Sequence, residues 1–274
     1  MPYIKQIVAV RRKPGLTRQE FFDYHFQVHG KIGQAPSKAE TPSRYFQVHL
    51  TDASYHPEGS NRGSNANPSW AFSDDITELY FESPDHLNSV FTSSWVKEKV
   101  GPDGANFSDF GASLPVAVQE KVVPFQGGAS PEDIDPLSSS LVAMYFISAA
   151  NSDIDALVSG FANNLQQFAA SQVRMLVANV PVNLPFDANA YFGSAPGRPV
   201  FDLVFAVHLR GKDGVPALRK AQNAFEEAYS SMINLEHTWI AFGQRALVFD
   251  QDQNIKVCFE RPPVYYTPAQ YFTV

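Results

Sequence analysis

The sequence predicts an α+β fold in which two βαββαβ units pair their sheets within one chain. Three observations support this prediction. Apolar and polar residues alternate at 5–10, which indicates a strand. Thr17 and Glu20 have the spacing of a capping box, which indicates that a helix begins there. A segment rich in Gly, Ser and Pro begins at residue 126, and the same order of elements recurs after it.

The first half indicates, in order, a strand, a helix, two strands, a helix and a strand. The first strand is expected at 3–12, because Pro14 and Gly15 then end it. The helix capped by Thr17 has one face formed by Phe22, His25, Phe26 and His29. The remaining elements of this half are strands at 43–50, 75–82 and 114–123, a polar loop at 51–69 and a helix at 84–99 that begins after Ser83.

The second half shows the same order with different residues. A helix capped by Ser152 is expected to reach residue 170, and a second helix is expected at 214–229. A loop with several Pro and Gly residues separates the middle strands at 181–199. The strands of this half are expected at 141–147, 173–180, 200–209 and 238–249.

One βαββαβ unit is the split βαβ, ferredoxin-like arrangement, which has a helix layer on only one face of its sheet. The bare face must be covered, and two such sheets that face each other would close into a barrel with the helices outside. We therefore divide the chain into four parts, which are a first repeat at 1–125, a linker at 126–139, a diverged second repeat at 140–254 and an extended C-terminal arm at 255–274.

Composition narrows the class of protein. The chain has 274 residues, 44% hydrophobic and 18% charged, which is typical of a globular protein with a substantial core. The net charge of -7 disfavours a nucleic-acid partner, whose phosphates call for a basic surface. Cys258 is the only cysteine, so no intrachain disulfide can form. The N-terminus lacks the features of a signal peptide and no apolar run approaches about 20 residues, so we expect a cytoplasmic protein with no membrane partner.

Several motifs of cofactor-dependent enzymes are absent from the sequence. There is no Gly-x-Gly-x-x-Gly after a strand, no phosphate-binding loop, no Gly-x-Ser-x-Gly and no Cys-x-x-Cys. These absences disfavour nicotinamide, flavin, ATP and serine-hydrolase chemistry. We therefore expect no cofactor.

Several segments of the first half resemble a known family. They are the strand end and turn from Arg11 to Thr17, then Glu20-Phe21 and the helix that ends at His29, the strand from Asp75 to Phe81, and the run from Asp103 to Phe110. On these segments the chain resembles the EthD-like domains of the dimeric α/β-barrel superfamily over roughly residues 3–124. The second half keeps the element order but lacks the Arg-Arg-Lys-Pro-Gly signature and the helix that ends in histidine.

The resemblance implies a cofactor-independent fold used in polyketide tailoring and in catabolism. Relatives include cyclases, dehydratases or decarboxylases, isomerases and cofactor-free monooxygenases, as well as proteins with no established catalytic activity. The tandem-repeat form with a long insert is similar to fungal biosynthetic-cluster proteins. Fold alone does not fix the chemistry.

His25 and His29 lie one helical turn apart and are candidates for three roles. Histidines at this spacing can bind zinc or iron, but residue 26 is Phe where His-Glu-x-x-His motifs have Glu, so we expect no metal. His29 is the stronger candidate for proton transfer, because its ordinary pKa lies near neutrality. The alternative is a structural histidine at a helix C-terminus.

The second and third strands carry the other polar candidates. Tyr45, Gln47 and His49 share one face, and we expect that face to line the barrel interior. Glu78 and Tyr80 share a face of the third strand and would suit proton abstraction and enolate stabilisation if they met a cavity. The alternative for Glu78 is an ion pair with a cation such as Arg44.

These candidates lead to one preferred function and two alternatives. We expect a small-molecule enzyme of secondary metabolism that performs acid–base elimination, decarboxylation, cyclisation or isomerisation on a polyketide-like or aromatic carbonyl compound. The alternatives are a cofactor-free monooxygenase and a non-catalytic binding protein. A homodimer is possible. The expected catalytic residues are His29, His49, Tyr80 and Glu78, and the expected substrate-binding residues are Tyr45, Gln47, His25, Phe81, Trp95 and His208.

Overall fold

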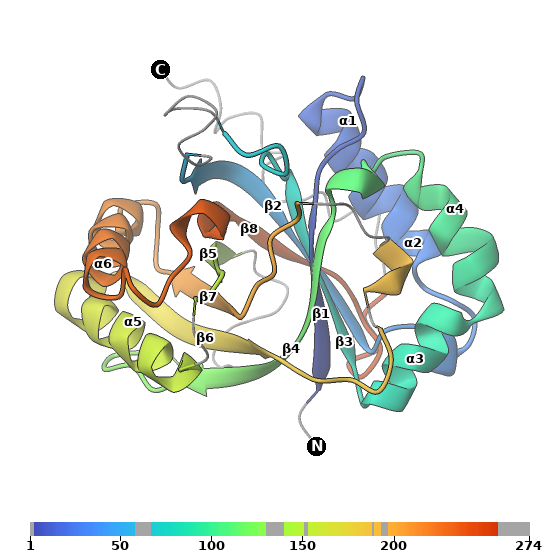
Figure 1. The fold of residues 1–274 in the computed structure, drawn as a ribbon. Coiled ribbons are helices and arrows are strands. Elements are labelled where there is room, and N and C mark those ends of the chain that lie inside the picture. Colours follow the sequence, from blue (N-terminus) through green and yellow to red (C-terminus); the bar gives the residue numbers. More distant parts are fainter. Residues whose placement is uncertain are drawn as a thin grey trace.

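The computed structural model describes residues 3–57, 67–129, 140–150, 153–187, 189–192 and 197–256. Ser152, Cys258, most of the linker and most of the C-terminal arm lie outside the described residues. Eight antiparallel strands form a closed barrel in the order β1-β3-β2-β8-β5-β7-β6-β4 (Figure 1). Their bounds are β1 (Ile4–Val10), β2 (Arg44–Tyr55), β3 (Asp75–Phe81), β4 (Leu114–Val123), β5 (Ser140–Ile147), β6 (Val173–Pro181), β7 (Leu203–Leu209) and β8 (Trp239–Asp250).

The barrel closes by pairing the two halves of the chain at two seams. The strands of the first half lie in the order β4-β1-β3-β2, and those of the second half lie in the order β8-β5-β7-β6. The seams are the antiparallel pairs β2–β8 and β4–β6, with Val48 opposite Arg245 and Val122 opposite Val177. The expected barrel is therefore confirmed.

Figure 1 shows the helices outside the barrel, with α5 and α6 on one side and α1 to α4 on the other. The capping box at Thr17 is confirmed, because its hydroxyl accepts from the Glu20 N–H at 3.2 Å and the Glu20 carboxylate accepts from the Thr17 N–H at 2.7 Å. The helices are α1 (Arg18–Asp23), α2 (Gly30–Ile32), α3 (Pro84–Thr92), α4 (Gly101–Gly104), α5 (Ile154–Ala169) and α6 (Gly214–Ala228), and two π-helical turns, η1 (Tyr24–His29) and η3 (Val96–Val100), connect α1 to α2 and lead into α4.

Some boundaries differ from the sequence predictions. The strand β2 continues to Tyr55 because it pairs with β8 as far as Trp239. The helix expected at 84–99 stops at Thr92, and the chain resumes with η3. α5 begins at Ile154, where Asp153 accepts from the Ala156 N–H. No helix in the described part of the chain has the length and hydropathy needed to cross a membrane.

Apolar side chains from all eight strands fill the barrel. On β4, for example, Leu114, Val116 and Val118 alternate along one face, and they share a single buried cluster with residues of every other strand. A cluster that every strand contributes to can only lie inside the barrel. The alternate residues of each strand therefore point outward, toward the helices.

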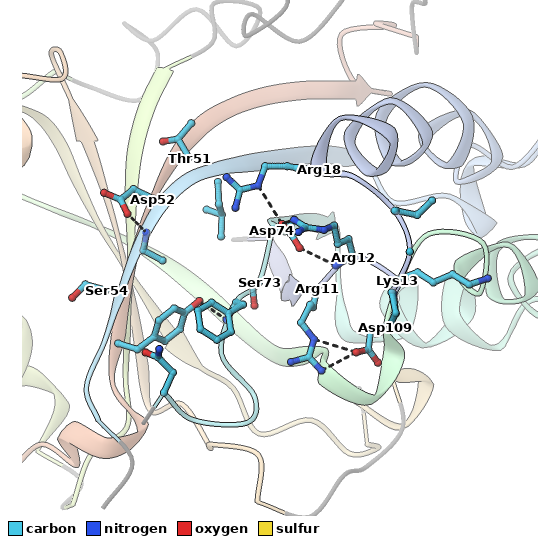
Figure 2. Close-up of a pocket in the computed structure, with 18 residues that line it drawn as sticks. Arg11, Arg12, Lys13, Arg18, Thr51, Asp52, Ser54, Ser73, Asp74 and Asp109 are labelled. Carbon is cyan, nitrogen blue, oxygen red and sulfur yellow. Dashed lines mark hydrogen bonds and ion pairs between the residues drawn. The ribbon is translucent and has the colours of Figure 1, made fainter. Parts of the chain in front are cut away.

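The helix layer of the second half is filled with side chains. Phe161 of α5 and Phe225 of α6 pack against Tyr145 and Phe205 on the outer face of the sheet, with ring centroids 4.5 to 6.3 Å apart. The first half differs, because its sheet and its helices enclose a cavity. A separate surface cleft, shown in Figure 2, lies where the turn after β1 meets the far part of β2.

Candidate functional site

The cavity of the first half lies between the outer face of its sheet and the helices α1 to α4. Its volume is about 90 Å³, and its wall is mostly apolar. His25 and His29 from the π turn η1 line it, and Tyr191 and Phe192 of the second half, from the 3-10 turn η6 (Ala190–Phe192), complete its wall. Single π turns within helices are frequent at functional sites.

His29, which lines this cavity, forms a dyad with Asp103. The His29 Nδ1 atom lies 2.8 Å from Asp103 Oδ2, and the other oxygen of Asp103 accepts from the Tyr24 hydroxyl at 2.6 Å and from the Asn106 amide at 3.0 Å. Burial raises the pKa of Asp103, but the hydrogen bonds from His29, Tyr24 and Asn106 outweigh it and lower that pKa. Asp103 is therefore ionised and can only accept.

This arrangement fixes the tautomer of His29. Because Nδ1 must donate its proton to the carboxylate, Nε2 carries the lone pair of the neutral imidazole. In the described part of the chain, Nε2 makes no hydrogen bond. A histidine held this way by a carboxylate has the geometry of a general base.

A chain of buried hydrogen bonds runs beside the dyad. The Gln47 amide donates to the Tyr45 hydroxyl at 2.6 Å and to the His25 carbonyl at 3.0 Å, and it accepts from His49 Nε2 at 2.7 Å. The Tyr45 hydroxyl is hydrogen-bonded to His25 Nε2 at 3.0 Å. The Gln47 amide sets the direction of its own three bonds, and the chain links His49 to His25.

Asp75 lies fully buried between two histidines. Its carboxyl oxygens are 3.6 Å from His25 Nδ1 and 3.6 Å from His49 Nε2, and one of them accepts from the Thr77 hydroxyl at 3.2 Å. Burial raises the pKa of Asp75 well above its ordinary value, lowers the pKa of His25 well below its ordinary value and lowers that of His49 to about 3. Burial therefore favours the uncharged forms of Asp75, His25 and His49, whereas Asp103 carries a negative charge.

The expectation about the orientation of the second strand is wrong. Tyr45, Gln47 and His49 do not line the barrel interior, because they face the helices and contact His25 and Phe22. Sequence alternation could not decide this, since both faces of the sheet are buried. The correction moves the three residues to the same side of the sheet as His29.

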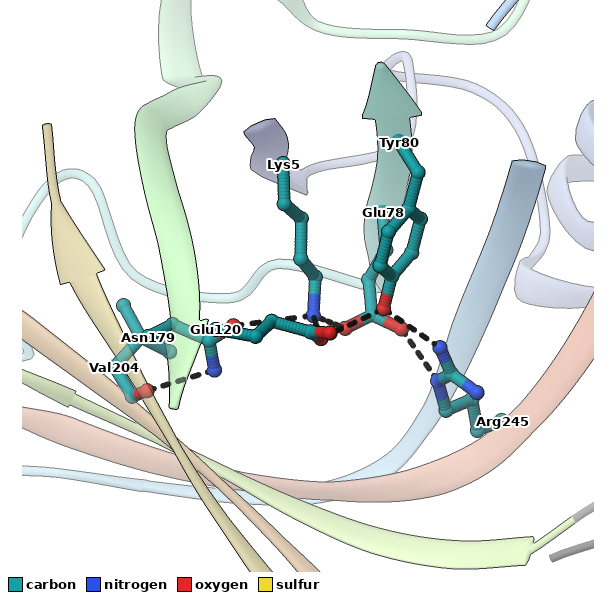
Figure 3. Close-up of polar contacts among 7 residues, drawn as sticks. All are labelled: Lys5, Glu78, Tyr80, Glu120, Asn179, Val204 and Arg245. Carbon is teal, nitrogen blue, oxygen red and sulfur yellow. Dashed lines mark hydrogen bonds and ion pairs between the residues drawn. The ribbon is translucent and has the colours of Figure 1, made fainter. Parts of the chain in front are cut away.

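Glu78 and Tyr80 lie on the other face, inside the barrel, so the four expected catalytic residues are divided between two sides of the sheet. Figure 3 shows their surroundings, where Glu78 forms ion pairs with Lys5 and Arg245. The Tyr80 hydroxyl donates to Glu120 at 2.8 Å. Neither residue lines the cavity.

The alternative reading of Glu78, an ion pair with a cation, is confirmed, but its partners are Lys5 and Arg245. Arg44, the example given, pairs instead with Asp250 and Asp252 at the outer end of the seam. His208 also faces the barrel interior, where its ring lies 3.4 Å from the Ser140 hydroxyl. Burial, followed by the nearby charge of Arg245, lowers the pKa of His208 to about 3.

Phe81 and Trp95 do not reach the cavity. The Phe81 ring packs against Phe91 of α3, with ring centroids 5.8 Å apart. Trp95 donates its indole N–H to the Ile32 carbonyl at 2.8 Å, which connects the start of η3 to α2. Both residues support the helices that form the cavity wall.

The sequence reasoning missed Asp103 as the partner of His29. Asp103 opens the run that ends at Phe110, which was one of the segments of family resemblance, so a signal existed. Asp75 was named only as the start of a strand, and Tyr191 of the second half was not considered. Within the described residues, no group of three or more His, Cys, Asp or Glu side chains is arranged to hold a metal ion.

Comparison with known proteins agrees with the fold and with part of the sequence. Residues 13–111 match the family model of the EthD domain. The match to the EthD domain is confined to the first half of this chain. This stretch includes His29, Asp75 and Asp103, whereas Tyr191 lies beyond it. No curated protein matches the sequence.

Solved structures with similar folds have low sequence identity. An anthrone oxidase-like protein is 10% identical, with 92% of this chain and 95% of that chain covered and a TM-score of 0.56. A proposed monooxygenase from Lactobacillus acidophilus NCFM is 9% identical, with 90% and 96% covered and a TM-score of 0.45. At this identity, the first of these likenesses supports the fold and no more.

Proposed function

We propose that the chain is an enzyme that abstracts a proton from a small carbonyl compound, with His29 as the general base. The observation that carries this proposal is the His29–Asp103 hydrogen bond of 2.8 Å in the wall of an apolar cavity. Asp103 holds the imidazole in one tautomer and stabilises the imidazolium that forms. His25 and His49, whose pKa values are lowered by burial, support the site as neutral hydrogen-bonding groups.

The electron flow in this step is simple. Nε2 of His29 takes a proton from the carbon next to the carbonyl, the C–H electrons form a C=C bond, and the carbonyl π electrons move to oxygen. The resulting oxyanion needs a hydrogen-bond donor. Tyr191 supplies a candidate, because burial and then the charge of Asp103 raise the pKa of its hydroxyl to about 12 and keep it protonated.

The Tyr191 hydroxyl is also available, since it makes no hydrogen bond within the described part of the chain. Return of the proton to another carbon isomerises the substrate, and loss of a group from the β carbon completes an elimination. Both outcomes belong to the acid–base reactions that we expected from the sequence.

The cavity size limits the substrate. About 90 Å³ is less than the ~150 Å³ that encloses a benzene molecule. A short-chain carbonyl compound therefore fits the closed cavity, whereas an aromatic or polyketide-like compound requires its wall, which includes Tyr191 and Phe192, to shift outward. We propose an aromatic carbonyl substrate, because many aromatic rings line the site. Binding of such a substrate requires the outward shift of the cavity wall.

A second candidate function is oxidation without a resident cofactor, which the anthrone oxidase-like neighbour suggests by its name. The first step is the same proton abstraction. The enolate carbon then adds molecular oxygen, and the peroxide anion takes back the proton held by His29 to give a hydroperoxide. Loss of water, which includes the second hydrogen of that carbon, leaves a new carbonyl group. Oxygen consumption separates this function from the first.

We propose further that the two halves are copies of one βαββαβ unit. The shared strand order, β4-β1-β3-β2 and β8-β5-β7-β6, supports this. Residues 3–129 alone would then expose the edges of β2 and β4, and they should pair as a homodimer in light scattering. A folded monomer would count against the equivalence of the halves.

The test of function is deuterium exchange at carbon, followed by NMR in heavy water with a panel of ketones from butanone to anthrone. His29→Ala should lower the exchange rate by ~10²–10⁴-fold. His237→Ala, which removes a histidine of the second half, is the matched control and should retain the rate. Equal rates for His29→Ala and wild type would refute the proposal. An oxygen electrode in the same samples, with and without EDTA, identifies the oxidative alternative.

A further inference from the structure

The turn after β1 carries a group of cations that the proposed function does not use. It lines the surface cleft shown in Figure 2, which has a volume of about 920 Å³. The end of β2, residues just before β3 and Asp109 form the other walls. Four cations, Arg11, Arg12, Lys13 and Arg18, fall within eight residues of a chain whose net charge is -7.

Arg11 has a structural role in this cleft. Its guanidinium donates twice to Asp109 Oδ2, at 3.1 and 2.8 Å, and its remaining terminal nitrogen donates to the carbonyls of Ser69 and Ala71. Figure 2 shows Arg11 and Asp109 facing each other. This clamp holds together the walls of the cleft.

Arg12 and Arg18 share a single carboxylate. Arg12 Nη1 pairs with Asp74 Oδ1, the Arg12 N–H donates to Asp74 Oδ2 at 3.0 Å, and Arg18 Nε donates to Asp74 Oδ1 at 3.3 Å. The Asp74 side chain is 3% exposed, whereas those of Arg12 and Arg18 are 36% and 50% exposed. One buried carboxylate therefore anchors two guanidinium groups and balances only one of them.

The anchored groups keep free donors. In the part of the chain that the structure describes, Nη2 of Arg12 and both terminal nitrogens of Arg18 make no hydrogen bond. Guanidinium groups bind carboxylates and phosphates through two parallel hydrogen bonds. The surplus charge and the free donors suit one such anion.

An exposed aromatic ring lines the same cleft. Phe72 is 57% exposed and has a φ of 73°, a left-handed conformation that a bulky side chain rarely adopts. Its N–H donates to the Tyr55 hydroxyl at 3.0 Å, and the two rings lie 5.7 Å apart. Backbone strain of this kind is concentrated at functional sites.

We infer that this cleft binds a small organic anion, a phosphate or carboxylate attached to a flat apolar group. Arg12 and Arg18 receive the anion, and Phe72 with Tyr55 contacts the apolar group. The cleft is separate from the cavity of His29, although the chain passes from one to the other at Ser108-Asp109.

Calorimetric titration of the full chain with phenyl phosphate, benzoate and neutral benzyl alcohol tests this inference. At least one of the two anions should bind saturably and at least tenfold tighter than the alcohol, and the stronger of the two identifies the anion type. Arg18→Gln should weaken the bound anion by about tenfold, since it removes a charge-assisted pair. Lys121→Gln removes a surface cation elsewhere and should bind as wild type does.

Phe72→Gly is a second variant, and it should fold as well as wild type because it relieves the backbone strain at residue 72. Glycine adopts a φ of 73° without a Cβ clash, so the melting temperature should hold or rise while binding of the aromatic anion weakens about fivefold. The inference is overturned if neither anion binds tighter than benzyl alcohol. The inference is also overturned if both Arg18→Gln and Phe72→Gly bind the aromatic anion with wild-type affinity.

Discussion

Lys5→Met should destabilise the barrel, because Lys5 is the central cation of the buried cluster in Figure 3. Its side chain is 1% exposed, and its ammonium group contacts Glu78, Glu120 at 2.8 Å and the Asn179 side chain at 3.2 Å. Methionine has a similar volume but no charge. The substitution therefore leaves two carboxylates close together with Arg245 as the remaining cation.

The magnitude follows from the titration of Glu78. Burial raises its pKa, but Arg245 and Lys5 outweigh this effect and lower the pKa from 4.5 to about 2. That difference corresponds to ~3 kcal/mol at ~1.36 kcal/mol per pKa unit, and Arg245 and Lys5 produce it together. Removal of one partner of a buried ion pair typically costs ~3–5 kcal/mol. We expect Lys5→Met to lower the free energy of unfolding by ~3 kcal/mol at pH 7.

The sign of the pH dependence also follows. Because the pKa of Glu78 is lower in the folded state, its contribution is fully present above pH 4.5 and is lost as the pH falls through about 2. Urea unfolding of wild type and Lys5→Met should therefore show a constant difference between pH 5 and pH 7 and a narrowing difference toward pH 3. A difference below ~1 kcal/mol at pH 7, or one that does not narrow in acid, would refute this reasoning.

Lys121→Met is the matched control for that experiment. Lys121 pairs with Asp155 at 3.6 Å, but the two side chains are 62% and 91% exposed. Water screens such a surface pair, so its loss should cost less than ~1 kcal/mol. Comparable losses in the two variants would show that burial of the Lys5 cluster has no special energetic role.

Three further variants test other parts of the structure. Thr17→Ala removes the helix cap and should cost ~1 kcal/mol in thermal unfolding, whereas Thr17→Ser should not. Gly243→Ala places a Cβ 2.5 Å from the carbonyl oxygen of His49 in the neighbouring strand, so it should cost ~1–3 kcal/mol and lower the melting temperature. Tyr191→Phe keeps the ring but removes the proposed oxyanion donor, so deuterium exchange should slow by ~10²–10³-fold with an unchanged melting temperature.

The order of the elements could be predicted from the sequence, because it depends on local signals. The capping box at Thr17 and the alternation in β1 depend on interactions between residues close in sequence, and tertiary contacts do not override them here. The end of β2 could not be predicted, because residues 51–55 are polar and become a strand only by pairing with β8. The direction in which each strand points could not be predicted either, since both faces are buried.

The candidate site was predicted in part for a similar reason. Helical spacing showed that His25 and His29 share a face, but it could not show that Asp103, 74 residues later, lies against His29. Glu78 and Tyr80 were given the chemistry that suits their types, whereas the fold uses them in an ion-pair cluster between the two halves. In both cases the observed role depends on contacts between segments that are far apart in the sequence.

The closure of the barrel within one chain has a consequence for how this protein can change. In a barrel built from two identical subunits, every substitution appears twice, so a residue that fills one helix layer fills both. Here the layer under α5 and α6 is filled by Phe161 and Phe225, while the layer under α1 to α4 retains a cavity. Because the two halves are covalently linked, each can change without the same change in the other. The filled half can therefore act as a rigid support and contribute Tyr191 to the cavity of the first half.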